Sequence, residues 1–226
     1  MIRSICVLAS AAICCLVCRE AAAQEYKVQK IESAAPADAI APEIAALMEP
    51  TGFKLAKGES RTVCEIWLCK EWPIKADAKT GNDVITPLTP GQLIGVIRYP
   101  RKATDFRDQE IPAGVYTLRY GQQPVDGAHV GTSPTRDFLV ASPADKDKDP
   151  GVLDYKALVA AGKETSGASH PAILSLQRPG DSQEPLAVRE DAEKEWVIVR
   201  FTGKSKAGDA AKPLALEAVL VGVAKE

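Results

Sequence analysis

The clearest pattern in the chain is an alternation of apolar and polar side chains over residues 115–120. The even-numbered residues, two tyrosines and a leucine, would share one face of an extended chain, and the residues between them the other. This period of two predicts a β-strand with one buried face. A second strand is expected at 136–140. The glycines and prolines of residues 121–135 predict a long ordered loop between the two strands.

Similar β-rich patterns predict further strands, at 26–31, 61–72, 92–99, 172–176, 196–201 and 214–223. The last two flank the polar residues 203–212, which predicts a hairpin with a turn region there. Short helices are expected at 42–49, which starts with a proline, and at 154–161, with Asp154 as the cap and Gly162 as the stop. Because Gly- and Pro-rich turns rather than long helices separate the strands, the sequence predicts a mainly β fold. We expect an antiparallel β-sandwich or jelly-roll-like single domain with two short helices.

The first 23 residues have the pattern of a secretory signal, with Arg3, an apolar stretch at 5–17 and a small-residue cleavage site at Ala21–Ala23. Removing 23 of the 226 residues leaves 203, residues 24–226, enough for one domain. We therefore expect export to the periplasm or the cell exterior. No stable membrane span is expected after cleavage, because the apolar stretch is shorter than about 20 residues. A lipoprotein anchored at Cys18 stays an alternative.

Cleavage would leave only Cys64 and Cys69, both within a predicted strand. Five residues of extended chain span roughly 16 Å, beyond the ~7 Å between the Cα atoms of bridged cysteines. We therefore expect no disulfide bond between them.

Composition and motifs narrow the function classes without selecting one. The net charge is −2 and the sequence has no basic patch, which argues against a nucleic-acid partner. Phosphate-binding, dinucleotide-binding, zincin and C-x-x-C motifs are missing, so no cofactor is expected. The stretch Gly131-Thr-Ser133 begins like a nucleophile elbow but lacks the closing glycine. The charged residues 144–150 predict a solvated surface loop.

The loop at 121–135 is the expected recognition surface, because long ordered loops in compact domains often bind ligands. Polar residues in or near this loop, together with the second histidine of the chain, form the set of ligand-binding candidates: Arg119, Asp126, His129, Arg136, Asp137 and His170. The alternative is structural, since Asp-Gly pairs form turns and arginine–aspartate pairs on strands are mostly solvated ion pairs.

Two other kinds of site stay open. If the two histidine loops meet at one end of the sandwich, His129 and His170 with Asp126 or Asp137 supply ligand types for a metal. Sugar binding would use aromatic side chains on the predicted strands, although such rings are more often core residues. The candidates for this role are Trp67, Trp72, Tyr116 and Tyr120.

Three segments, IPAGVYTLRY, DGAHVGTSPTRDFL and SHPAILSL, resemble a group of exported bacterial proteins of unknown function. The resemblance implies that these segments belong to one domain and that His129 and His170 lie in its characteristic motifs, and it supplies no activity. We expect a non-catalytic binding or structural module whose partner is a small molecule, a glycan or an envelope protein. The alternative is a metal-dependent or carbohydrate-acting hydrolase using the two histidines.

Overall fold

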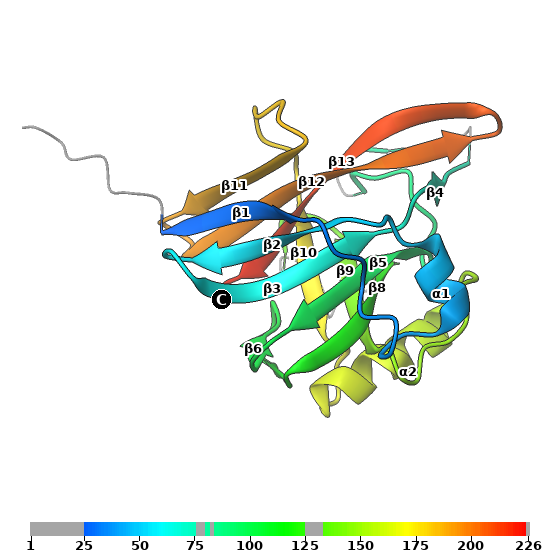
Figure 1. Ribbon diagram of the computed structural model, residues 1–226, viewed down its shortest axis with the longest axis horizontal. Coiled ribbons are helices and arrows are strands. Elements are labelled where there is room, and N and C mark those ends of the chain that lie inside the picture. Colours follow the sequence, from blue (N-terminus) through cyan, green and yellow to red (C-terminus); the bar gives the residue numbers. More distant parts are fainter. Residues whose placement is uncertain (1–24, 76–79, 82–83, 125–132, 225–226) are drawn as a thin grey trace, which may run out of the picture.

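The computed structural model describes residues 25–75, 80–81, 84–124 and 133–224 (Figure 1). They form a mainly β single domain with two helices, which confirms the predicted antiparallel, sandwich-like fold class. The helices are α1 (Pro42–Leu47) and α2 (Tyr155–Ser166). The strands are β1 (Tyr26–Ile31), β2 (Gly52–Lys57), β3 (Arg61–Leu68), β4 (Trp72–Pro73), β5 (Leu93–Tyr99), β6 (Ala103–Thr104), β7 (Glu110–Ile111), β8 (Gly114–Gln122), β9 (Asp137–Pro143), β10 (Ile173–Gln177), β11 (Leu186–Asp191), β12 (Trp196–Ala207) and β13 (Ala210–Val221).

Eleven of the described strands form one curled sheet, in the order β1-β2-β3-β5-β8-β9-β10-β13-β12-β11, with β4 beside β12. Neighbours in this order are antiparallel, whereas β4 runs parallel to β12. The sheet curls until β1 and β11 lie side by side (Figure 1), where the Tyr26 amide donates to Glu190 Oε1 at 3.1 Å. Phe53 and Phe201, from β2 and β12, stack with centroids 5.7 Å apart. One core therefore connects the two halves of the sheet.

Most strands predicted from alternation are present, among them β1, β3, β5, β8, β9 and β10. The pattern missed β2, where a bulge between Leu55 and Ala56 shifts the register against β3. Both residues are buried, at 0% and 2% exposure, so the sequence does not alternate there. It also missed β6 and β7, which have two residues each, and the edge strand β11, none of whose residues is fully buried.

The predicted end of the second helix at Gly162 is wrong. Asp154 caps α2 as predicted, by accepting from the Ala157 amide at 2.8 Å, but the helix continues to Ser166. It ends at Gly167, whose φ of 61° is left-handed. Gly162 instead marks a close approach to β9, since a Cβ there would lie 2.6 Å from Val140 Cγ1.

The hairpin of β12 and β13 is longer than predicted. Residues 203–212 were expected to form a turn region, yet the strands stay paired from Gly203↔Leu214 to Ala207↔Ala210. Only Gly208 and Asp209 form the turn, and Gly208 has a φ of 58°. Polar residues suit this stretch because the hairpin extends beyond the rest of the sheet into solvent (Figure 1).

The aromatic residues considered for sugar binding lie in the core. Trp67, Trp72, Tyr116 and Tyr120 are between 0% and 6% exposed, so none presents a ring face to a sugar. Both indole N–H groups are satisfied by carbonyls, that of Trp67 by Ser33 at 2.8 Å and that of Trp72 by Ile94 at 2.9 Å. These residues contribute to stability through burial of large rings.

Cys64 and Cys69 are both free thiols in the core. Burial raises the pKa of each thiol to about 12. The side chains are therefore protonated and weakly nucleophilic at neutral pH.

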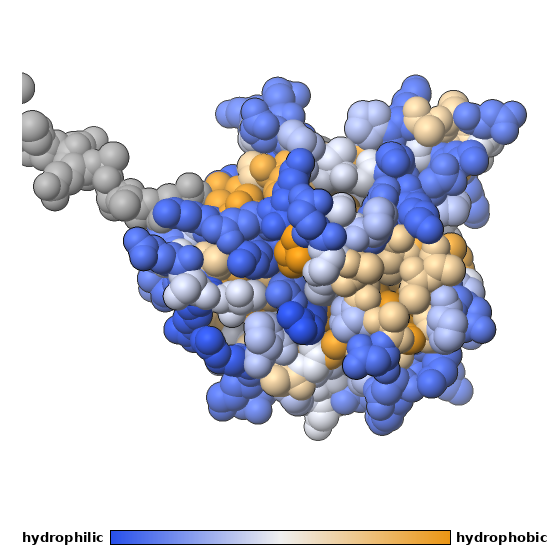
Figure 2. All heavy atoms as spheres, in the orientation of Figure 1, coloured by the Kyte–Doolittle hydropathy of each residue, from blue (hydrophilic) through white to orange (hydrophobic). Residues whose placement is uncertain are grey.

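Hydrophilic residues cover most of the face seen in Figure 2, and a pale apolar patch lies over the α1 region. Leu47, the last residue of α1, is 40% exposed. Among the described residues, no helix combines the length and apolar character that a membrane crossing requires. The predicted signal lies outside the described residues, so export stays a prediction.

Candidate functional site

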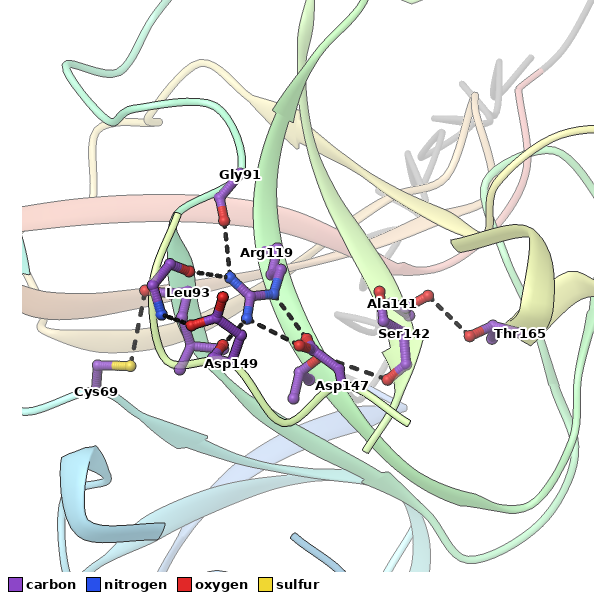
Figure 3. A network of polar contacts seen from close by, with 11 residues as sticks. Cys69, Gly91, Leu93, Arg119, Ala141, Ser142, Asp147, Asp149 and Thr165 are labelled. Atoms are coloured by element: carbon purple, nitrogen blue, oxygen red, sulfur yellow. Dashed lines mark hydrogen bonds and ion pairs between the residues drawn. The ribbon is translucent and has the colours of Figure 1, made fainter. Parts of the chain in front are cut away.

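Arg119 on β8 lies at the centre of a buried polar network (Figure 3). The side chain is 0% exposed. Its Nε and Nη2 atoms donate to the two carboxylate oxygens of Asp147 at 2.7 and 2.9 Å. Asp147 also accepts from the Thr117 hydroxyl. Arg119 and Asp147 therefore form a bidentate ion pair that is shielded from water.

The remaining guanidinium N–H groups bind main-chain carbonyls. Nη1 donates to Gly91 O at 2.9 Å and to Gly151 O at 2.6 Å, and Nη2 also donates to Asp149 O. The expectation of a solvated loop at 144–150 is wrong for Asp147, because a buried guanidinium requires a buried counter-charge. Every N–H of Arg119 is used, so this residue fixes the loop to the sheet and has no donor left for a ligand.

Tyr120 and Asp137 form a second buried pair, and both residues are 0% exposed. The Tyr120 hydroxyl donates to Asp137 Oδ1, and the Ile85 amide donates to Oδ2 at 2.8 Å. Burial raises the pKa of Asp137, while these hydrogen bonds oppose the rise. Burial, followed by the Asp137 carboxylate, raises the pKa of Tyr120, so the phenol keeps its proton. Gln122 extends the pair outward, because its Nε2 donates to the Tyr120 oxygen at 2.8 Å.

The described ends of the predicted recognition loop are tied together. Arg136 donates from Nε and Nη2 to Gln123 O at 2.9 and 2.6 Å, and the Gln123 amide donates to Arg136 O at 2.8 Å. Arg136 is thus a half-buried link across the base of the loop. Asp126 and His129 lie outside the described residues, so their meeting with His170 stays a prediction.

Residues 121–124 form one wall of a cavity of about 820 Å³. Helix α2 forms another wall, and His170 lines the same cavity. The structure thus brings the start of the predicted recognition loop and the segment of His170 to one place. Apolar residues from four separate segments line the interior: Phe106, Phe138, Val140, Leu158, Val159 and Ile173.

Exposed polar residues also line the cavity, including the cations Arg107 and Lys163 and the carboxylate of Asp108. Tyr155 at the start of α2 is 56% exposed, although large apolar side chains are usually covered. His170 is exposed, and its Nδ1 lies 3.0 Å from Ser169 Oγ. The cavity therefore combines an apolar interior with polar and charged groups at solvent-accessible positions.

Asp105 positions the cavity wall that carries Phe106. Its Oδ1 accepts from the amides of Arg107 and Gln109 at 2.8 Å, and its Oδ2 accepts from Gln109 Nε2 at 2.8 Å and the Ile173 amide at 3.0 Å. The carboxylate thus ties the β6–β7 connection to β10, and its 1% exposure protects these bonds from water.

The geometry gives little support to the other predicted sites. Within the described residues, no three His, Cys, Asp or Glu side chains lie close enough together to hold a metal. Ser133 Oγ lies 3.0 Å from Ser175 Oγ, and a hydroxyl is no general base for a nucleophilic serine.

A second cavity of about 790 Å³ lies near α1 and the 150–152 segment. It is lined by Leu47 and by Val152, which is 57% exposed, and by charged residues such as Glu49 and Lys204. Glu49 and Lys204 pair with each other at 3.3 Å. An apolar probe has this second cavity as an alternative binding site. A binding experiment therefore needs a variant that changes the second cavity alone.

No family model, curated protein or solved structure matches the chain. The site therefore stands on the geometry of its own residues. The site residues predicted from the sequence did not include four that line the cavity: Phe106, Gln122, Leu158 and Lys163. Gln122 lies within the predicted recognition loop, and Leu158 on the predicted buried side of a helix, so these two had a signal in the sequence.

Proposed function

We propose that this protein is an exported, non-catalytic binding module that holds a small, mainly apolar molecule in the cavity between residues 121–124 and α2. The observation that carries this proposal is the cavity itself, about 820 Å³ with an apolar interior and polar groups around it. Small-molecule sites in proteins have this size and this mixture of lining residues.

The apolar lining explains why the ligand should be apolar over most of its surface. Phe138 and Leu158 are held by β9 and α2, and Phe106 is fixed by the Asp105 carboxylate and by an edge contact to Trp196 at 5.2 Å. A ligand that covers these side chains gains roughly 25 cal/mol for each Å² of apolar surface removed from water. Pre-formed walls keep the entropic cost of binding low.

Two of the charged candidate residues do not line the cavity. Arg119 and Asp137 are fully buried in structural networks. The rival proposal, a metal-dependent or carbohydrate-acting hydrolase using His129 and His170, has one supporting observation, which is that His170 lines the cavity. The pairing of His170 with the adjacent Ser169 is a local contact between exposed groups.

The test is saturable binding of 8-anilinonaphthalene-1-sulfonate, an apolar anion suited to a cavity lined by Arg107 and Lys163. Val159→Trp places an indole in the cavity, whereas Ala160→Trp makes the same change at an exposed neighbouring position on α2. We expect one site in the native protein, at least tenfold weaker binding in Val159→Trp, and unchanged binding in Ala160→Trp.

Binding that survives Val159→Trp and is lost in Val152→Asp would move the site to the second cavity and contradict the proposal. Zinc-dependent cleavage of a p-nitrophenyl ester or glycoside, abolished by His170→Ala, would support the hydrolase instead. Circular dichroism of each variant shows whether the fold is retained.

A further inference from the structure

Two cations line the first cavity from opposite walls. Lys163 follows Tyr155 and Val159 on α2 at intervals of four residues, so the three side chains share one side of the helix. All three line the cavity, which places that side of α2 toward it. Arg107 lines the cavity from the connection between β6 and β7.

The segments that carry the two cations both contact Pro171, which also lines the cavity. A Cβ on Gly162, the residue before Lys163, would lie 2.5 Å from Pro171 Cβ, so the last turns of α2 pack against this proline. Gln109, two residues after Arg107, donates from Nε2 to Pro171 O at 3.2 Å. Lys163 and Arg107 therefore belong to the same end of the cavity.

The other end of the cavity is uncharged. It is formed by residues 121–124, by Phe138 and by the first turn of α2. Gly121 pairs with Phe138 in the register of β8 and β9, and a Cβ on Gly121 would lie 3.4 Å from Leu158 Cδ2. The residues that line this end include no lysine, arginine, aspartate or glutamate within the described chain. The cavity thus has one charged and one uncharged end.

Positive charge exceeds negative charge at the charged end. The side chains of Lys163 and Arg107 make no ion pair or hydrogen bond with the described residues, whereas Lys146 pairs with Glu164 on the same helix. Asp108, next to Arg107, is the one carboxylate among the described residues that line the cavity. Two cations therefore face one carboxylate, in a protein whose net charge is −2.

We infer that the ligand is an apolar molecule with one singly charged anionic end, such as a carboxylate, which lies at Lys163 and Arg107 while the apolar part covers Phe138 and Leu158. This inference rests on the proposed function of the cavity. Both cations are exposed, so the anion reaches them without the cost of burying an unpaired charge. Lys163 and Arg107 are the specificity-determining residues.

The test compares decanoate with 1-decanol by titration calorimetry at neutral pH, each below the concentration at which it aggregates. The two compounds have the same chain length, and only decanoate is charged. One exposed ion pair changes an equilibrium constant by up to about fivefold, so with two cations we expect decanoate to bind about five- to twentyfold more tightly. This preference should shrink in about 1 M salt, where charges are screened within about 3 Å.

Single substitutions test each charged group. Lys163→Gln and Arg107→Gln should each lower the preference for decanoate about threefold. Lys156→Gln makes the same change at an exposed position of α2 that does not line the cavity, and should keep the full preference. Asp108→Asn removes the opposing carboxylate and should raise the preference about twofold, and asparagine suits the φ of 61° at this position. Circular dichroism establishes that each variant is folded.

The outcomes separate the two proposals. Equal affinities for decanoate and 1-decanol, both lost in Val159→Trp, overturn the inference and leave the proposed function standing. A preference for decanoate that survives in the double variant Lys163→Gln/Arg107→Gln also overturns the inference. Absence of binding by both compounds overturns the proposed function and the inference together.

Discussion

Removing the guanidinium of Arg119 should destabilise the fold without changing the chemistry of the cavity. Arg119→Met keeps an unbranched apolar side chain of moderate length in place, but leaves the Asp147 carboxylate buried without its counter-charge. The carbonyls of Gly91, Asp149 and Gly151 lose their donor at the same time. The attachment of the 144–151 segment to β8 would then be weakened, because Asp147 keeps only the Thr117 hydroxyl and Gly91 O only the Leu153 amide among these partners.

The expected loss is about 3–5 kcal/mol, the usual effect of removing one partner from a buried ion pair. For a domain of this size, each kcal/mol lowers the melting temperature by roughly 2–4 °C, so the shift should be about 6–20 °C. The double variant Arg119→Met/Asp147→Leu should recover part of this loss, since no buried charge is then left unpaired.

Urea unfolding followed by circular dichroism measures both free energies. Arg101→Met is the matched control, because Arg101 is exposed, and its effect should stay within about 0.5 kcal/mol. A loss below about 1 kcal/mol for Arg119→Met, or a double variant less stable than both single variants, would refute the reasoning that Arg119 is a structural residue.

Three further predictions concern helix packing, pH dependence and the cavity wall. Gly162→Val should cost about 1–3 kcal/mol in urea unfolding, because a Cβ at this position would lie 2.5 Å from Pro171 Cβ. Above pH 9 the unfolded chain releases thiol protons that folded Cys64 and Cys69, with pKa raised to about 12, still hold. Stability should therefore fall with rising pH by up to about 1.4 kcal/mol per unit for each thiol, and the loss should be smaller in a double alanine variant. Asp105→Ala should cost about 3 kcal/mol and weaken dye binding, whereas stability loss with unchanged dye affinity would show that the wall is not set by this carboxylate.

Local patterns in the sequence were enough to predict most of the sheet. Alternation located β8, and the Asp154 cap located the start of α2. The expectation that β8 buries one face is wrong, because Thr117 and Arg119 on the other face are buried as well. Local patterns do not predict the structure at a residue whose place is set by a contact with a distant part of the chain. Glycine commonly ends a helix, so the sequence predicts a helix end at Gly162. In the structure Gly162 lies inside α2, where Val140 is too close to leave room for a side chain.

The candidate site was harder to predict for the same reason. The partner of Arg119 lies 28 positions away in a stretch that has the composition of a solvated loop, so its burial has no signature in the sequence. Phe106 is held in the cavity wall by the carboxylate of Asp105, which the sequence gives no reason to connect with β10. Donor and acceptor assignments of this kind depend on pairs that only the folded chain brings together.

The most direct test of the binding proposal is an amide NMR titration of the protein with 1-decanol. The proposal predicts saturable shifts of Gly121, Gln122, Leu158 and His170, which line the cavity, with little change at Val152 in the second cavity. Shifts centred on Val152, or no saturable shift at the four cavity residues, would contradict the proposal that this cavity is the binding site.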